Sequence, residues 1–333
     1  MYKVTILPSE KEILADPNES ILDAALRSGL NMAYSCNNGS CGECKALIIA
    51  GDVEQISHHD YRLTQAEKLN NTVLLCSCAA KSDCAIEAGE AKHAADIAHQ
   101  RVRAKVSKIE RPHAEFVVLQ LRTPRTKTLR FLAGQYVRLS VDGIAPLEAS
   151  VASCPCNGMI MEFHLYRDAG HPFVDYVFDE MKPGEQIRIE GPYGEFNLDE
   201  ESKRAIVMVG VDIGFAPLKS LIEHAIALDL EQAIQLYWVV TREGMHYREN
   251  YCRSWEDALD TFIYKPLVLD YSSNLQESVA TIVNEIIASS PIESEIDLYL
   301  SGDPHVLRVL KQAFIARGTP QEHVFCEQKS ELI

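Results

Sequence analysis

The sequence has no excess of basic residues, and no apolar stretch approaches the roughly 20 residues that a membrane-spanning helix needs. Its 32 lysines and arginines are outnumbered by 48 aspartates and glutamates, which gives a formal net charge of −16. Nucleic acid and anionic membranes are not expected as partners, because phosphate groups are bound by basic surfaces. The N-terminus alternates like a strand and shows no secretory signal peptide, which predicts a cytoplasmic location.

The chain is 333 residues long, more than one ordinary core of about 100–200 residues. Hydrophobic residues make up 47% of it and charged residues 24%, a globular composition that excludes a disordered or fibrous chain. Two or three domains are therefore expected. The sequence also has ten cysteines. In a reducing compartment, clustered cysteines are interpreted first as metal ligands rather than as a disulfide framework.

Four cysteines have the spacing that plant-type ferredoxins use for a 2Fe-2S cluster, C-x4-C-x2-C followed by a distant fourth. Thiolates must converge on two irons in a tight loop, and Gly39 and Gly42 let the backbone curl where a side chain would collide with the cluster. A zinc site is the weaker alternative, because structural zinc usually has two C-x2-C pairs and only one is present here. The predicted cluster ligands are Cys36, Cys41, Cys44 and Cys76.

The residues around these cysteines predict a small β-grasp domain. Residues 3–7 and 12–15 alternate like strands, and an amphipathic helix is expected from Ser20. We expect residues 74–76 to form a buried strand that delivers the fourth ligand, and residues 82–87 to form the closing strand. Cys78 is the alternative to Cys76 as the fourth ligand, whereas Cys84 is expected to pack in the core.

The chain divides into three predicted domains: 1–92, then a polar linker at 93–100, then 101–200 and 201–333. The middle part has short alternating runs separated by turn signals, which is typical of an antiparallel β-barrel. In the last part, apolar strands alternate with amphipathic helices, as in an α/β doubly wound parallel sheet with its ligand site at the carboxyl ends of the strands. Barrel strands are expected at 103–109, 116–121, 135–141, 160–166 and 186–189, with a helix at 172–182. The last domain is expected to have strands at 205–209, 234–240, 266–269 and 297–300 and helices at 218–227, 275–288 and 305–317.

Four short motifs follow one another in a specific order: A-G-Q-Y at 133–136, I-E-G-P-Y-G-E-F at 189–196, G-F-A-P-L-K-S at 214–220 and Y-L-S-G-D-P at 299–304. With them the whole chain resembles the ferredoxin-containing branch of the ferredoxin–NADP reductase superfamily, which includes reductases of bacterial oxygenases and CDP-6-deoxyglucoseen reductases. The resemblance implies a 2Fe-2S ferredoxin domain, an FAD-binding-type barrel and an NAD(P)-binding-type α/β domain.

The resemblance also implies a reaction in which NAD(P)H reduces FAD and the flavin passes single electrons to the 2Fe-2S cluster. The cluster would then reduce a protein electron acceptor, such as an oxygenase component or a dehydratase component. Ser301 matches the family's catalytic cysteine near the nicotinamide. The positions that match cofactor contacts are Ser150, Gly170, Gly214, Pro217 and Gly302.

Several matching positions depart from the family's pattern. Residues 147–150 read L-E-A-S in place of R-x-Y-S, so that a phosphate clamp and a stacking platform are missing and Glu148 is expected to repel phosphate. Val174 replaces a hydroxyl residue near the barrel helix, and residues 211–214 read V-D-I-G in place of G-G-T-G. An electron relay or accessory subunit in which only the cluster functions is the alternative, and a redox-sensing interaction protein is a third.

Two further groups of residues resemble ligand sets. In Cys154-Pro155-Cys156 the spacing is expected to be too cramped for an ordinary disulfide, and buried small residues are favoured over a metal or redox pair. His58-His59-Asp60 is expected to be a solvated turn. Near the C-terminus, Phe325 is a candidate to cover a flavin face, whereas Gln328 and Lys329 replace an expected aromatic residue.

Overall fold

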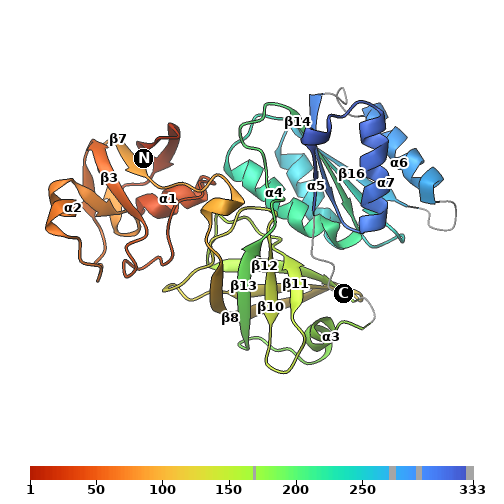
Figure 1. Cartoon of the computed structure of the whole chain (residues 1–333), viewed down its shortest axis with the longest axis horizontal. Helices are drawn as coiled ribbons and strands as arrows, with labels where there is room; N and C mark the ends of the chain where they lie inside the picture. Colours follow the sequence, from red (N-terminus) through yellow and green to blue (C-terminus); the bar gives the residue numbers. More distant parts are fainter. Residues whose placement is uncertain (168–169, 270–274, 290–294, 328–333) are drawn as a thin grey trace.

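The computed structural model describes residues 1–167, 170–269, 275–289 and 295–327, which form three domains in chain order (Figure 1). The N-terminal domain has a five-stranded sheet in the order β2-β1-β7-β3-β5 and a separate two-stranded ladder, β4-β6. Ser20 caps helix α1 because its hydroxyl accepts the Asp23 N–H at 3.0 Å. The elements are β1 (Tyr2–Leu7), β2 (Lys11–Ala15), α1 (Ile21–Arg27), β3 (Lys45–Ala50), β4 (Val53–Gln55), α2 (Gln65–Leu69), β5 (Thr72–Leu74), β6 (Cys78–Ala80) and β7 (Cys84–Ala88).

The prediction of a strand over residues 74–76 is wrong. Strand β5 ends at Leu74, and Cys76 lies in a single 3-10 turn, η1 (Leu75–Ser77). The turn starts where the Leu75 N–H donates to the carbonyl of Cys44 at 3.0 Å. This bond brings the fourth predicted ligand back to the loop that carries the other three.

The predicted linker is more ordered than its polar composition suggested. Ala91 and Ile97 are buried together with Leu132 of the barrel domain, and a short 3-10 turn, η2 (Ala94–Asp96), lies between them. Gln100, the last residue of the predicted linker, already pairs with Gly191 as part of the first barrel strand. The connection is therefore packed against the domain that follows it.

The middle domain is an antiparallel six-stranded sheet in the order β11-β10-β13-β8-β9-β12. Alternate residues of its strands, with residues of one helix, form an apolar core that includes Val117, Leu139 and Phe163. The helix ends at Asp179, before the predicted boundary at 182. The elements are β8 (Gln100–His113), β9 (Phe116–Arg122), β10 (Tyr136–Ser140), β11 (Leu147–Ser150), β12 (Ile160–Tyr166), α3 (Pro172–Asp179) and β13 (Gln186–Tyr193).

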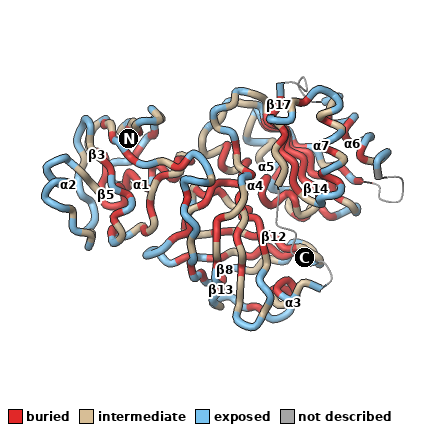
Figure 2. Tube along the Cα trace, viewed as in Figure 1, coloured by how far each residue is buried: buried red, intermediate tan, exposed pale blue. Residues whose placement is uncertain are grey.

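The C-terminal domain has a parallel five-stranded sheet in the order β16-β15-β14-β17-β18, with helices on both faces (Figures 1 and 2). Strands β15 and β17 are buried along their whole length, which explains why most of their residues are apolar. The chain reverses direction across the sheet between β14 and β17, the position where such folds bind ligands. The elements are β14 (Ala205–Val211), α4 (Phe215–Ala227), β15 (Ile234–Val240), α5 (Glu249–Ala258), β16 (Phe262–Val268), α6 (Leu275–Ser289), β17 (Ile296–Ser301), α7 (Pro304–Ala316) and β18 (Val324–Cys326).

A buried lysine joins the barrel to the α/β domain. The Lys219 ammonium, on α4, donates to the Ala152 carbonyl at 3.0 Å and lies 2.6 Å from Glu223 and 3.3 Å from Glu162 on β12. Burial lowers the pKa of Lys219, but the two carboxylates outweigh it and raise that pKa. The next residue, Ser220, donates to the Ser153 carbonyl at 2.8 Å. Helix α4 is thus bonded to the barrel at two successive positions.

No helix within the described ranges is both long and apolar enough to cross a membrane.

We predict that Lys219→Ala lowers the free energy of unfolding of the α/β domain by about 3 kcal/mol, because it leaves two half-buried carboxylates without their cation. Urea unfolding followed by tryptophan fluorescence measures this directly, since the chain's two tryptophans, Trp238 and Trp255, both lie in that domain. Lys265→Ala, at an exposed position of β16, is the control. An unfolding midpoint for Lys219→Ala equal to that of the control would contradict the prediction.

Candidate functional site

The four predicted cluster ligands lie together at one end of the N-terminal domain. Cys36 Sγ lies 3.1 Å from Cys41 Sγ, and the Cys76 thiol donates a hydrogen bond to the Cys44 sulfur. This bond lowers the pKa of Cys44 and raises that of Cys76. Cys36 also interacts electrostatically with Cys44 and Cys76, so the four sulfur atoms lie close together, as ligands of a compact metal cluster must.

Backbone N–H groups point at these sulfur atoms. Burial raises the pKa of Cys36, but the N–H groups of Asn38 and Cys41 and the Ser40 hydroxyl together lower it to about 6. The Glu43 N–H lies 3.4 Å from Cys41 Sγ. Donors of this kind stabilise thiolate, the form that binds metal.

The two loop glycines are needed for a different reason than the one expected. Gly39 and Gly42 have φ of +74° and +79°, a conformation that residues with a side chain rarely adopt. A Cβ on Gly39 would lie 2.3 Å from His59 Cβ, and one on Gly42 would lie 2.3 Å from the Tyr61 ring. Because Gly39 and Gly42 have no side chains, the segment that contains His59 and Tyr61 can pack over the loop.

The two other cysteines of this domain and the segment His58-His59-Asp60 largely match the surroundings predicted for them. Cys78 and Cys84 are buried thiols, and burial raises the pKa of each. His58 and Asp60 are exposed and 3.5 Å apart, which confirms the predicted solvation of these two residues, whereas His59 is half-buried and residues 58–60 form no turn. His59 bonds to the Tyr61 carbonyl at 2.9 Å.

The cysteine loop also forms the contact with the barrel. The Asn37 N–H donates to the Arg125 carbonyl at 2.9 Å, and the Thr128 N–H donates to the Ser35 carbonyl at 3.0 Å. Tyr34 is buried, and a Cβ on Gly158 would lie 2.0 Å from its hydroxyl. Cys36 therefore sits within the segment that docks on the barrel.

A cleft of about 310 Å³ lies where the barrel meets the α/β domain. Its volume is at the lower end of the ~300–1,000 Å³ found for ligand pockets. One wall comes from β11, β12 and the start of α3, and the other comes from the turn between β14 and α4. The lining residues include Leu147, Glu148, Ala149, Ser150, His164, Tyr166, His171, Val174, Ile213 and Ala216.

One carboxylate beside this cleft joins two predicted site residues. The hydroxyl of Ser150, at the end of β11, donates to Glu327, and the hydroxyl of Ser301, at the end of β17, donates to the other Glu327 oxygen at 2.6 Å. Glu327 itself is held by its N–H, which donates to the Leu300 carbonyl at 2.9 Å. Sequence reasoning did not propose Glu327 as a site residue, because no local motif marks a contact between residues 177 positions apart.

The predicted glycines at the sheet crossover are also brought together. A Cβ on Gly214 would lie 2.1 Å from the Ser301 carbonyl oxygen, and a Cβ on Gly302 would lie 2.5 Å from the Val211 carbonyl oxygen. Pro217 is buried in the first turn of α4. Gly170 is separate from this group and precedes α3, where an added Cβ would meet no atom within 4 Å.

The residues that depart from the family's pattern have local partners. Glu148 pairs with Arg138 on the adjacent strand at 3.0 Å, which offsets the repulsion expected from its charge. The Asp212 carboxylate accepts the N–H and the hydroxyl of Thr241, each at 2.9 Å. It therefore points toward the end of β15, where two donors stabilise its charge. Burial raises the pKa of Asp212.

Two further predictions concern Val174 in the barrel helix α3 and Phe325 as a residue that covers a flavin face. His171 caps α3 by accepting the Phe173 N–H at 3.2 Å, and Val174 is buried. Phe325 stacks on Tyr299 with ring centroids 4.7 Å apart and lines a different cavity, beside Lys11 and Asn197. Gln328 and Lys329 lie outside the described residues.

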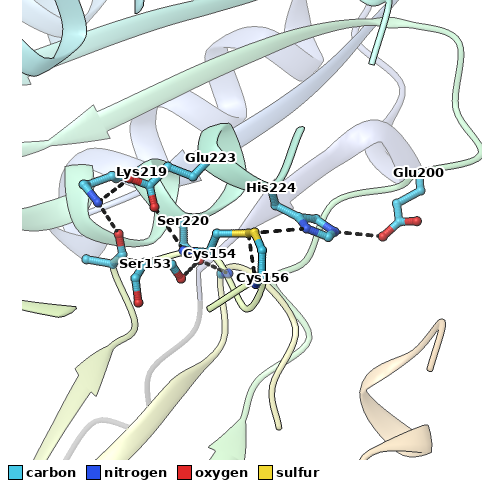
Figure 3. Close-up of a disulfide and its surroundings, with 10 residues drawn as sticks. Ser153, Cys154, Cys156, Glu200, Lys219, Ser220, Glu223 and His224 are labelled. Carbon is cyan, nitrogen blue, oxygen red and sulfur yellow. Dashed lines mark hydrogen bonds and ion pairs between the residues drawn. A yellow bond between two sulfur atoms is a disulfide. The ribbon is translucent and has the colours of Figure 1, made fainter. Parts of the chain in front are cut away.

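The preference for two separate buried residues at Cys154 and Cys156 is wrong. The structure joins the two cysteines in a disulfide, with their Cα atoms 5.2 Å apart (Figure 3). This Cα separation lies inside the range of 4.4–6.8 Å that disulfides usually span.

Comparison with known proteins agrees with this geometry. Residues 4–81 match the family model of the 2Fe-2S iron-sulfur cluster binding domain. The whole chain aligns with the CDP-6-deoxy-L-threo-D-glycero-4-hexulose-3-dehydrase reductase of Yersinia pseudotuberculosis serotype I (strain IP32953), at 28% identity over 97% of each chain. The chain is a 2Fe-2S ferredoxin domain fused to a ferredoxin–NADP reductase-like module.

Other relatives have the same extent. The reductase component of propane 2-monooxygenase from Gordonia sp. (strain TY-5) is 26% identical over 98% of this chain and 96% of the relative. Among solved structures, the Amycolatopsis cytochrome P450 reductase GcoB superimposes with a TM-score of 0.62 at 23% identity over 98% of each chain. The ferredoxin domain, the barrel and the α/β domain therefore occur together in this order in several proteins.

The residues present suit two of the groups that such a fold implies. The ferredoxin domain supplies four converging sulfur atoms with aligned N–H donors, which fits a 2Fe-2S cluster. The cleft of the reductase module has apolar walls at Ala149, Ile213 and Ala216 with the Ser150 hydroxyl beside them, which fits a flavin ring. No lysine or arginine occurs among the described residues that line the cleft, so a pyrophosphate there would depend on neutral donors.

We predict that Cys76→Ser abolishes the cluster, whereas Cys78→Ser retains it, because only the Cys76 sulfur bonds to another predicted ligand. Iron and acid-labile sulfide per chain, measured after anaerobic purification, distinguish the two variants. Cys84→Ser controls for the loss of a buried thiol in the same domain. A full cluster in Cys76→Ser, or its loss in Cys78→Ser, would overturn the assignment of the fourth ligand.

Proposed function

We propose that this protein is an NAD(P)H-dependent iron–sulfur flavoprotein reductase that passes electrons through FAD and a 2Fe-2S cluster to an acceptor protein. The observation that carries this proposal is the Glu327 carboxylate, which bonds Ser150 of the barrel and Ser301 of the α/β domain at the junction of the two. A flavin on one side and a nicotinamide on the other would meet at these three side chains.

Ser150, Ala149 and the apolar side chains opposite them would hold the flavin ring. When bound, FAD takes two electrons as a hydride and releases them one at a time, which is the conversion that a one-electron cluster requires. Ser150 offers a hydroxyl to the ring's edge, and Glu327 orients that hydroxyl. Gly170 leaves open space before α3, whose N-terminus favours negative charge.

Gly214 and Gly302 would let a dinucleotide approach the backbone at the sheet crossover, with Pro217 in the helix turn that follows. Ser301 stands beside them and shares Glu327 with Ser150, so we assign it the place next to the reacting nicotinamide carbon. Val211 and Ile213 add bulk at this turn, and Asp212 bonds to Thr241. These residues predict weaker dinucleotide binding than a glycine-rich turn would give.

In this proposal electrons leave through the ferredoxin domain, whose ligands we assign as Cys36, Cys41, Cys44 and Cys76. The docked loop places Cys36 against the barrel, which supports transfer from the reductase module. The acceptor is a component of an oxygenase or a dehydratase, as the names of the relatives suggest. We also propose a cytoplasmic location, because the cysteines that belong neither to the disulfide nor to the cluster, Cys78, Cys84, Cys252 and Cys326, are free thiols, the state that a reducing compartment maintains.

Acidic side chains of the ferredoxin domain are candidates for docking the acceptor. Asp52 and Asp60 are exposed. Glu54 pairs with Lys81 and Glu67 pairs with Lys45, each at 2.9 Å. The positions of Glu54 and Glu67 therefore present less net negative charge to an acceptor protein. A basic surface on the acceptor would therefore meet Asp52 and Asp60 first.

The deciding experiment is the visible spectrum of anaerobically purified protein before and after addition of NADH or NADPH. We expect absorption from the cluster and from flavin, release of FAD on denaturation, and bleaching by one of the two nucleotides. Cluster absorption with no releasable flavin and no bleaching would overturn the proposal and favour a relay that uses the cluster alone.

We predict that Glu327→Gln lowers kcat for NAD(P)H-driven reduction of ferricyanide by about 10²-fold, the scale typical of a group that positions or transfers a proton. KM for the nucleotide should change little, since the carboxylate bonds to the two serines rather than to the phosphates. Glu322→Gln, at an exposed position a few residues earlier, is the matched control. Unchanged turnover at unchanged flavin content would contradict this role.

A further inference from the structure

The Cys154–Cys156 disulfide lies outside the site described above, in the connection between β11 and β12 (Figure 3). It is packed against α4 of the α/β domain, where the Cys154 N–H donates to Glu223 at 3.0 Å. The segment that follows it, 157–158, contacts the ferredoxin domain at Tyr34. The disulfide is thus placed where all three domains meet.

A histidine stands beside one of its sulfur atoms. His224 Nδ1 lies 4.0 Å from Cys154 Sγ, and on the other side of the ring Nε2 bonds to Glu200 at 2.9 Å. The second Glu200 oxygen pairs with Lys11 at 2.8 Å. Burial raises the pKa of Glu200, but His224 and Lys11 lower it to about 2, so this carboxylate is ionised and orients the His224 ring through its hydrogen bond to Nε2.

The two sulfur atoms are not equivalent. Cys154 is 8% exposed, whereas Cys156 is half-buried and lines a cavity of about 230 Å³ between the barrel and the ferredoxin domain. The Cys156 N–H donates to Cys154 Sγ at 3.2 Å. An incoming thiolate can therefore reach Cys156, and the negative charge that its attack leaves on Cys154 is met by an N–H group and by His224.

We propose that Cys154 and Cys156 form a reversible redox pair that is reduced by a dithiol. One thiol of the dithiol loses its proton to solvent, and its thiolate attacks Cys156 Sγ to form a mixed disulfide. The Cys154–Cys156 bond breaks, its electron pair stays on Cys154, and Cys154 takes a proton by way of His224, which regains one from solvent. The second thiol of the dithiol then attacks its own sulfur in the mixed disulfide, and its proton passes to Cys156, which leaves as a thiol. Two electrons and two protons pass from the dithiol, which is left as a disulfide.

The neighbours of the pair favour this role over a purely structural crosslink. The ring that the disulfide closes spans only three residues, so it removes little freedom from the unfolded chain. A histidine held by an ionised carboxylate, a backbone donor to the leaving sulfur and a cavity at the attacked sulfur are the parts that thiol–disulfide exchange requires. In the proposed cytoplasmic location, moreover, disulfides are usually catalytic or redox-sensing.

Tryptic digestion makes the pair directly measurable, because peptide 139–167 contains Cys154 and Cys156 and no other cysteine. The full-length protein is equilibrated with mixtures of reduced and oxidised dithiothreitol, quenched with acid, alkylated with N-ethylmaleimide and analysed by mass spectrometry. Peptide 249–253, which carries Cys252 alone, is the internal control and should be labelled throughout.

We expect the two N-ethylmaleimide labels on peptide 139–167 to appear together. The midpoint of this change should lie within the range of reduced-to-oxidised dithiothreitol ratios used. Two free thiols at every ratio, a disulfide that persists in fully reduced dithiothreitol, or protection of both sulfurs by a bound metal would each overturn the proposal. This measurement needs neither flavin nor nucleotide, so its failure is distinguishable from the failure of the proposed function.

The assignment of His224 has its own test. His224→Gln should slow reduction of the pair by dithiothreitol at least about tenfold, since general acid catalysis contributes on the order of 10²–10⁴-fold. His305→Gln, at an exposed position on α7, should leave the rate unchanged. Equal rates for the two variants would remove His224 from the proposal.

Discussion

The Lys219 ammonium is the contact on which the geometry of the reductase module depends. A buried cation is costly unless oxygen atoms surround it, and here they come from two domains: Ala152 and Glu162 of the barrel and Glu223 of α4. Helix α4 begins where β14 ends, and β14 pairs with β17 so that Gly210 lies opposite Ser301. Fixing α4 on the barrel therefore also fixes Ser301 relative to Ser150, and one carboxylate can bond to both.

The ferredoxin domain is positioned by its own cysteine loop. Because Ser35 and Asn37 bond to the barrel on either side of Cys36, the segment that binds the metal is also the segment that docks. Lys11 adds a second attachment through Glu200, 2.8 Å away, and is held within its own domain by Glu90 at 2.7 Å. The proposed electron path and the domain interface therefore share the same residues, and a change in one alters the other.

Local patterns predicted most of the fold because each was determined by neighbours in the sequence. The spacing of Cys36, Cys41 and Cys44 belongs to one loop, and the strand predicted at 160–166 has the same bounds as β12. Helix α5 was not predicted, because ten residues that include Glu249, Arg253 and Asp257 are mostly polar, with only Cys252 buried. The apolar periodicity of a helical sequence is weak when only a narrow face of the helix packs against the rest of the protein.

The predictions that failed involve contacts between distant parts of the chain or the backbone itself. Cys76 was assigned to a strand because apolar neighbours look alike in strands and in short turns. No sequence motif predicted a role for Glu327, since that role depends on two serines in other elements. The disulfide was disfavoured on spacing alone, although the local turn of the backbone at Pro155 sets the distance between the two Cα atoms. Cys76 and Glu327 depend on contacts with distant residues and the disulfide on a local turn, and the sequence pattern records neither.

The amide contacts that dock the ferredoxin domain have a kinetic consequence. In the proposed path, transfer from the reductase module to the cluster is not a diffusional encounter, because donor and acceptor belong to one chain and are held together. Its rate is independent of protein concentration, and ionic strength has little effect on a contact made by neutral N–H and carbonyl groups. Delivery to a separate acceptor remains bimolecular and, for an acidic chain, is screened by salt. When the acceptor is scarce, the slow step therefore lies outside this molecule.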